Sequence, residues 1–162
     1  MSPHQVRVLI LACGNSLRCD DGVGPWLAEW AEEKFSACSD LRVISSQQWT
    51  PELAHDLACA ESAIFIDCSI ASAPGSVNLL PVHGAKVSQA LATHHLGAPE
   101  LLALSQDIYD EQPRRAFLLT IGAGSVELGE EFSAAGTAAL PGACRLLKNA
   151  IEQLLNAGSE PA

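Results

Sequence analysis

An apolar segment near the start of the chain leads into a glycine turn, an acidic pair and a helix. Residues 8–12 are a continuous apolar run, Gly14-Asn15 follows it, and Asp20-Asp21 come just before the helix. Apolar residues then recur at the helical positions i, i+3, i+4, i+7 and i+8, at Val23, Trp26, Leu27, Trp30 and Ala31. A strand that feeds a helix in this way places the acidic pair at the carboxyl edge of an α/β sheet, where such sheets bind ligands.

Asp20 and Asp21 admit two interpretations. Acidic residues commonly begin helices, because the macrodipole and the unpaired N–H groups of the first turn stabilise them. Alternatively, one of the two carboxylates points into a cleft and binds a metal or handles a proton. The residues elsewhere in the chain bear on this choice.

Strand-like and helix-like segments alternate along the rest of the chain. We expect strands at 6–12, 41–46, 62–68, 77–82 and 115–121, and helices at 22–36, 51–60, 97–110 and 138–157. The pattern predicts a single three-layer α/β domain over residues 1–162, with a twisted, mostly parallel sheet of about five strands and helices on both faces. The 77–82 strand is expected to be antiparallel or at an edge, because no crossover helix precedes it. Pro141 is expected in the first turn of the last helix or before it, and the tail 158–162 is expected to be loose.

Composition excludes several classes of protein. The net charge is −10 and the nine Lys and Arg residues are scattered, which argues against nucleic acid and anionic membranes as partners. No apolar run approaches the roughly 20 residues of a membrane helix. The first residues do not have the pattern of a signal peptide, so we expect a cytoplasmic protein with reduced thiols. Its six cysteines contain no C-x-x-C pair.

A second acid and a histidine pair stand at comparable positions. Asp67 ends the apolar run 64–66, and His94-His95 precede the predicted helix 97–110. Asp67 either caps the following turn or points to the same sheet edge as Asp20 and Asp21. Two carboxylates and one imidazole form a mixed oxygen and nitrogen set, which suits a divalent first-row metal with coordination positions left open to a substrate.

In these motifs the sequence resembles the endopeptidases that mature nickel-iron hydrogenases, the hydrogenase maturation protease family. The resemblance covers residues 6 to about 155, in the same order along the chain. It rests on four groups of residues: Gly14-Asn15 with Asp20-Asp21, Gly22 and Gly24; Asp67 with Pro74-Gly75; Thr93 with His94 and Leu96; and Val126-Glu127-Leu128-Gly129 with Phe132-Ser133.

The resemblance implies an endopeptidase that removes the C-terminal extension of a nickel-loaded [NiFe]-hydrogenase large-subunit precursor. It implies that Asp21, Asp67 and His94 contact the nickel, which the precursor supplies, so no permanently bound cofactor is expected. His94 is preferred to His95 because its spacing to Leu96 matches the family. Asp21 and Asp67 are also the candidate catalytic residues, since either carboxylate can act as a general base.

Two other functions are alternatives to this one. A metal-sensing or chaperone-like protein could bind the hydrogenase precursor without cutting it. A nucleotide-binding domain is disfavoured, because G-x-G-x-x-G is absent and the acidic pair would repel a pyrophosphate. Trp49 lies in a polar loop, where it either contacts a partner protein or folds onto the core.

Overall fold

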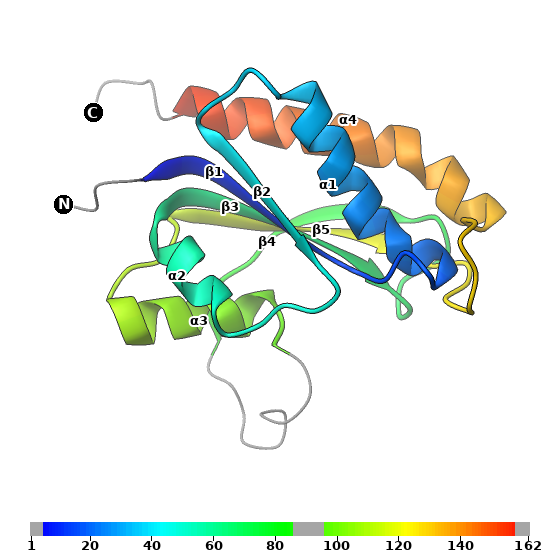
Figure 1. The fold of residues 1–162 in the computed structure, drawn as a ribbon, viewed down its shortest axis with the longest axis horizontal. Coiled ribbons are helices and arrows are strands. Elements are labelled where there is room, and N and C mark those ends of the chain that lie inside the picture. The colour runs from blue at the N-terminus through cyan, green and yellow to red at the C-terminus, as the bar shows by residue number, and fades with distance from the viewer. Residues whose placement is uncertain (1–4, 86–95, 158–162) are drawn as a thin grey trace.

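The computed structural model describes residues 5–85 and 96–157 and contains a five-stranded sheet (Figure 1). The strand order is β2-β1-β3-β5-β4, and every pair is parallel except the antiparallel β4–β5 edge. The strands are β1 (Val6–Cys13), β2 (Leu41–Ser46), β3 (Ala60–Ser69), β4 (Val77–Pro81) and β5 (Arg115–Gly122). The predicted sheet, including its antiparallel edge strand, is confirmed.

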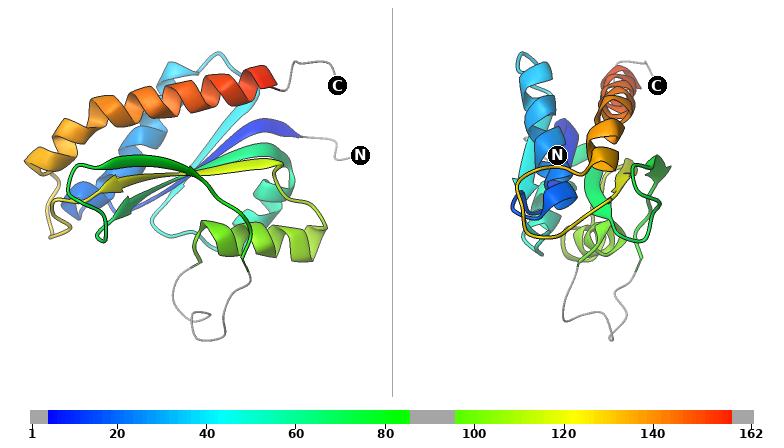
Figure 2. Two further views of the ribbon diagram at one scale, coloured as in Figure 1. Left: turned by 180° about the vertical axis from the view of Figure 1, so that it is seen from behind. Right: turned by 90° about the vertical axis from the view of Figure 1, so that its right-hand side faces the viewer.

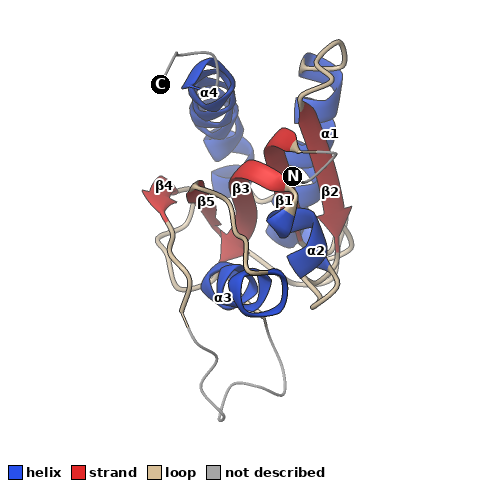
Figure 3. Cartoon of the chain, turned by 90° about the vertical axis from the view of Figure 1, so that its left-hand side faces the viewer, coloured by secondary structure: helices blue, strands red, loops and turns tan. Residues whose placement is uncertain are grey.

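Helices cover both faces of the sheet, as predicted. Helices α1 (Val23–Lys34) and α4 (Ala134–Ala157) lie on one face, and α2 (Leu53–Ala58) and α3 (Ala98–Tyr109) lie on the other (Figures 1 and 3). Side chains alternate along β1, so Val8 and Ile10 pack under α1 and α4 while Leu9 and Leu11 pack in the core on the α2 and α3 side. Each face therefore has its own apolar core.

Two details of the helices differ from the sequence prediction. Helix α4 begins at Ala134, and Pro141 lies inside it rather than in its first turn. The helix starts early because the Ser133 hydroxyl accepts the N–H of Gly136 and thereby caps it. Pro141 is tolerated because it and Thr137, whose carbonyl loses its helical partner, are both exposed to water.

In α1 the apolar stripe is narrower than its sequence suggests. Trp26 is 38 % exposed, whereas Val23, Leu27 and Ala31 are fully buried and the small residues Gly24 and Ala28 are buried beside them. A side chain at Gly24 would collide with the carbonyl oxygen of Cys13 at the end of β1. The glycine thus allows α1 to approach β1 closely.

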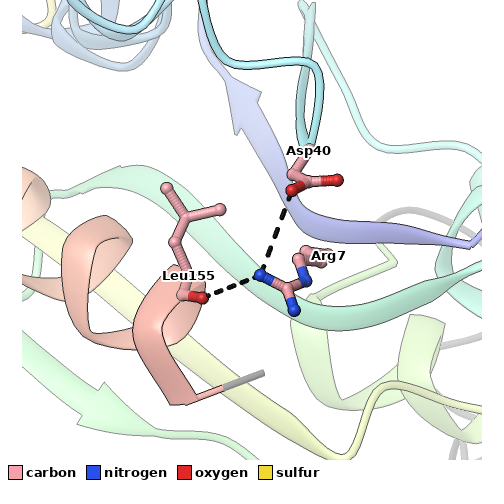
Figure 4. Close-up of polar contacts among 3 residues, drawn as sticks. All are labelled: Arg7, Asp40 and Leu155. Atoms are coloured by element: carbon pink, nitrogen blue, oxygen red, sulfur yellow. Dashed lines mark hydrogen bonds and ion pairs between the residues drawn. The ribbon is translucent and has the colours of Figure 1, made fainter. Parts of the chain in front are cut away.

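The opposite end of β1 is fastened to α4 and to the loop before β2. Arg7 donates from Nη1 to the carbonyl oxygen of Leu155 in the last turn of α4, at 3.1 Å, and lies 4.0 Å from the Asp40 carboxylate (Figure 4). A cation is favourable at a helix C-terminus, where carbonyl groups lack helical partners.

The strand order places a topological switch point between β1 and β3. The connection from β1 passes through α1 to β2 on one side, and the next one passes through α2 to β3 on the other side of β1. Open α/β sheets bind ligands at such points, outside the carboxyl ends of the strands. None of the helices in residues 5–85 and 96–157 is both long and apolar enough to cross a membrane.

Candidate functional site

A cavity of about 480 Å³ lies at the carboxyl ends of β1 and β3. Asp21 and Asp67 both line it, so the structure brings together the two carboxylates that the sequence singled out. The remaining wall comes from the ends of β1 and β3, the loop after β2 and the start of α3: Cys13, Gly14, Gln47, Gln48, Trp49, Cys68, Ile70, Leu96 and Gly97.

Asp21 is held at the cavity by the turn that follows β1. It belongs to η1 (Cys19–Gly22), a single 3₁₀ turn. The backbone N–H of Asn15 donates to Oδ2 of Asp21 at 2.7 Å. Gly14 has φ +151°, and a side chain there would collide with the Asp21 carbonyl oxygen, so this turn requires glycine. The Gly-Asn turn thus fixes the first carboxylate.

Asp67 reaches the same cavity by strand alternation. Ala63 and Phe65 point into the core on the α2 and α3 side, and Asp67 continues that face just past the core. One of its oxygens, Oδ1, accepts the thiol of Cys13 at 3.3 Å and the backbone N–H of Cys68 at 2.8 Å. These contacts orient the second carboxylate from two neighbouring strand ends.

Asp20 has a different role from its neighbour. It is fully buried, and its carboxylate accepts hydrogen bonds from the backbone N–H groups of Gly124, Ser125 and Ser133 and from the Ser133 hydroxyl. Burial raises the pKa of this carboxyl group, but the hydrogen bonds from Ser133, Gly124 and Ser125 outweigh it and hold the pKa below its ordinary value. Asp20 therefore ties η1 to the start of α4 as an anion.

The two acids of the pair therefore have different roles: Asp20 stabilises the fold, and Asp21 faces the cavity. Neither side chain caps α1, which begins at Val23 without a side-chain cap. Asp20 instead acts at the N-terminus of α4, about 110 residues further along the chain, where it accepts the N–H of the capping residue Ser133. Sequence reasoning missed this contact, because no local pattern relates Asp20 to Gly124 and Ser133.

His94 and His95 lie outside the described residues, as does Thr93. The described residues that follow them, Leu96 and Gly97, line the cavity. Among residues 5–85 and 96–157, no three His, Cys, Asp or Glu side chains are arranged to hold a metal ion. Asp21 and Asp67 would need a further donor to bind a metal, and the resemblance to the hydrogenase maturation proteases implies His94 as that donor.

Two cysteines of the cavity wall are poor nucleophiles. Burial, together with the charge of Asp67 and the hydrogen bond to it, raises the pKa of the Cys13 thiol far above its usual range. Burial and the charges of Asp21, Asp20 and Asp67 raise the pKa of Cys68 to about 12. Both groups are neutral thiols near pH 7, whereas a cysteine nucleophile must be a thiolate.

Trp49 folds onto the core, which decides between the two interpretations of this residue. Its side chain is 9 % exposed and packs edge-on against Phe65, with ring centroids 5.3 Å apart. It also forms part of the cavity wall. Its buried indole N–H lacks a hydrogen-bond acceptor in the part of the chain that the structure describes.

A larger cavity of about 680 Å³ lies at the amino edge of the sheet, between the end of β4 and the start of β5. Arg114, Arg115 and His83 are on its wall, with Asp107 as its one carboxylate among the described residues. It lacks the paired acids of the first cavity, so the candidate site is at the carboxyl edge.

Comparison with solved structures gives the same result as the motifs. The model superimposes on the hydrogenase maturating endopeptidase HybD from Escherichia coli with a TM-score of 0.70, 19 % identity, and coverage of 91 % of this chain and 93 % of that chain. The chain has the fold of the hydrogenase maturation endopeptidases.

Two archaeal structures extend this likeness. The hydrogenase 2 maturation peptidase from Thaumarchaeota archaeon SCGC_AB-539-E09 has a TM-score of 0.65 and 25 % identity, covering 90 % of this chain and 98 % of that one. The [NiFe] hydrogenase maturation protease HybD from Thermococcus kodakarensis has a TM-score of 0.62 and 24 % identity, covering 88 % and 97 %. No protein-family model and no curated protein matches the sequence. The predicted resemblance therefore extends over the whole fold of these endopeptidases.

Proposed function

We propose that this chain is an endopeptidase that removes the C-terminal extension of a [NiFe]-hydrogenase large-subunit precursor. The observation that carries the proposal is the pair Asp21 and Asp67 in one cavity at the β1/β3 switch point. The likeness to maturation endopeptidases over about nine-tenths of the chain supports it. The precursor is then the partner of this protein.

In this proposal, Asp21, Asp67 and His94 bind the nickel ion that the precursor carries. The nickel belongs to the substrate and leaves with it, so the enzyme needs no cofactor of its own. Two carboxylates in one cavity repel each other, and a divalent cation between them removes that cost. A precursor without nickel offers no such cation. The two carboxylates therefore favour binding of a precursor that is correctly loaded with nickel.

Peptide hydrolysis also requires an activated water. Asp21 and Asp67 are each oriented by a backbone N–H group, and a carboxylate held beside the scissile bond can accept a proton from water there. The substrate's metal supplies charge stabilisation for the developing oxyanion when it is bound. We therefore propose the two aspartates as both metal-binding residues and candidate general bases.

The decisive experiment is incubation with a nickel-loaded precursor, followed by mass spectrometry of the precursor's C-terminus. We expect a single cut with the wild-type enzyme and none with Asp21→Asn, Asp67→Asn or His94→Ala. His95→Ala is the matched control and should cut normally. A stable complex without cleavage by the wild-type enzyme would instead support a non-proteolytic binding protein for the precursor.

The dependence on nickel is tested separately. Precursor purified without nickel should not be cut, and adding free divalent cations to the enzyme should not restore cleavage. The enzyme alone should bind divalent ions weakly, because the substrate contributes the other ligands. Efficient cleavage of nickel-free precursor in the presence of a chelator would show that the metal does not gate the reaction.

A further inference from the structure

Three of the most exposed apolar side chains of the described chain are carried by loops at the carboxyl edge of the sheet. Leu17 is 54 % exposed, Ile70 79 % and Leu128 81 %. They lie on the loop after β1, the β3–β4 connection and the loop between β5 and α4, which meet at one end of the molecule (Figure 2, right). Ile70 also lines the cavity that holds Asp21 and Asp67. We call these three residues the apolar rim.

The three loops are fastened to one another. The N–H of Gly129 donates to the carbonyl of Leu17 at 2.8 Å, and the N–H of Ala123 donates to that of Ser69 at 2.9 Å. Asp20 adds its hydrogen bonds between η1 and the β5–α4 loop. The rim is therefore presented by a preorganised backbone, so a partner that binds it pays little for ordering the loops.

The charge around the rim favours one kind of partner. Glu127, Glu130 and Glu131 are exposed on the same loop as Leu128, and Arg18 is the one cation of the three loops. The chain as a whole carries −10. A segment with apolar side chains and flanking Lys or Arg residues is complementary both to the apolar contacts and to this charge.

We propose that the apolar rim docks an apolar, basic-flanked segment of the hydrogenase precursor next to its scissile bond. The inference rests on the proposed function and goes further, because it assigns binding to residues that touch neither the metal nor the cut bond. Continuity between the rim and the cavity through Ile70 supports a single bound chain that runs from one to the other. Docking of this kind acts on affinity and leaves the chemical step unchanged.

The test compares Leu17→Ser/Leu128→Ser with Ile108→Ser, a control at the far end of α3 that is 58 % exposed. With nickel-loaded precursor as the substrate, we expect KM to rise at least tenfold in the rim variant while kcat stays within twofold. The control should match the wild type in both. All three proteins should unfold at the same temperature, because the substituted side chains are exposed.

Several results would overturn the proposal. An unchanged KM in the rim variant would show that the rim does not bind precursor, and so would an equal loss in the Ile108→Ser control. A solution dimer that the rim substitutions dissociate would show that a second copy covers the rim. Failure of the wild-type enzyme to cut at all would refute the proposed function itself.

The proposed Lys or Arg residues of the docked precursor segment are tested with the triple variant Glu127→Gln/Glu130→Gln/Glu131→Gln. Neutralising these charges should reduce the dependence of kcat/KM on salt concentration, because charges at the edge of an interface act on the rate of association. An unchanged salt dependence would contradict the assignment of basic residues to the docked segment.

Discussion

Replacing Asp20 with Asn should destabilise the fold, because this buried anion joins segments that are distant in sequence. Oδ1 accepts the N–H of Ser133 at 2.8 Å. Oδ2 accepts three donors, including the Ser133 hydroxyl at 2.6 Å and the N–H of Gly124 at 2.6 Å. An amide keeps only one acceptor oxygen, so its NH₂ group must face at least one of these N–H or O–H donors.

The size of the effect follows from these bonds. A hydrogen bond to a charged group contributes about 1.5–3 kcal/mol, and at least one is replaced by an unfavourable donor–donor contact. The other bonds lose the charge that strengthens them. We expect the free energy of unfolding of Asp20→Asn to fall by about 3 kcal/mol. For a domain of this size, that lowers Tm by about 6–12 °C.

Asp21→Asn is the matched control. The Asn15 N–H that Asp21 accepts can be accepted equally by an amide oxygen, so we expect a change within about 1 kcal/mol. Urea titration and thermal unfolding followed by circular dichroism measure both variants. Equal losses in the two variants, or an unchanged Tm for Asp20→Asn, would refute the assignment of Asp20 as the structural anion and Asp21 as the site carboxylate.

The contribution of Asp20 to the stability of the fold should depend on pH. Because the pKa of Asp20 is lower in the folded protein than in the unfolded chain, its contribution is full above the unfolded value, about 3.9, and is lost as the pH falls through the folded value. The difference in stability between the wild type and Asp20→Asn should therefore be constant from pH 7 to about pH 5 and narrow below about pH 4. If the difference in stability between the wild type and Asp20→Asn did not change on acidification, that would contradict a lowered pKa of Asp20 in the folded protein.

Other substitutions test neighbouring features by the same unfolding assays. Gly136→Ala should lower the free energy of unfolding by about 1–3 kcal/mol, because the new side chain would collide with Asp20. Gly142→Ala in the same helix meets open space and should raise it by about 0.5–1 kcal/mol. Similar effects of the two substitutions would contradict the close contact between Gly136 and Asp20. Pro141→Ala should stabilise α4 by about 1–3 kcal/mol, since an interior helical proline lacks its N–H, and a loss of stability would contradict its placement inside the helix. Trp49→Phe should stay within about 1 kcal/mol of the wild type, because it removes a buried donor that has no acceptor among the described residues, while Trp49→Ala should cost about 3 kcal/mol. A large loss in the Phe variant would mean that the indole N–H has a partner.

Much of the fold was predictable from local sequence patterns. Continuous apolar runs at residues 8–12 and 63–66 indicate strands that are buried on both faces, and both lie in the middle of the sheet. The short connection before Val77 indicated an antiparallel edge strand, since a parallel crossover needs more residues. Of the candidate site, the positions of Asp21 and Asp67 followed from the ends of the strands beside them.

Local patterns failed where a distant contact decides the structure. The start of α4 was predicted four residues late, because Pro141 is a strong local signal and the Ser133 cap is stabilised by Asp20 from the other end of the chain. Trp26 fits the apolar period of α1 and yet is partly exposed, whereas Gly24, which has no side chain, lies directly against the end of β1. The spacing of apolar residues identifies the apolar face of a helix. How deeply each residue on that face is buried depends on the elements packed against it.

The sequence by itself determined which residues could form the site, and the tertiary structure alone separated their duties. Asp20 and Asp21 are adjacent and chemically identical, so no local rule distinguishes them. Asp20 is buried because the loop between β5 and α4 brings four hydrogen-bond donors around it, and Asp21 faces the cavity because that same anchoring fixes η1. A buried carboxylate is stable only where its charge is matched by such donors, and these come together only when the chain has folded.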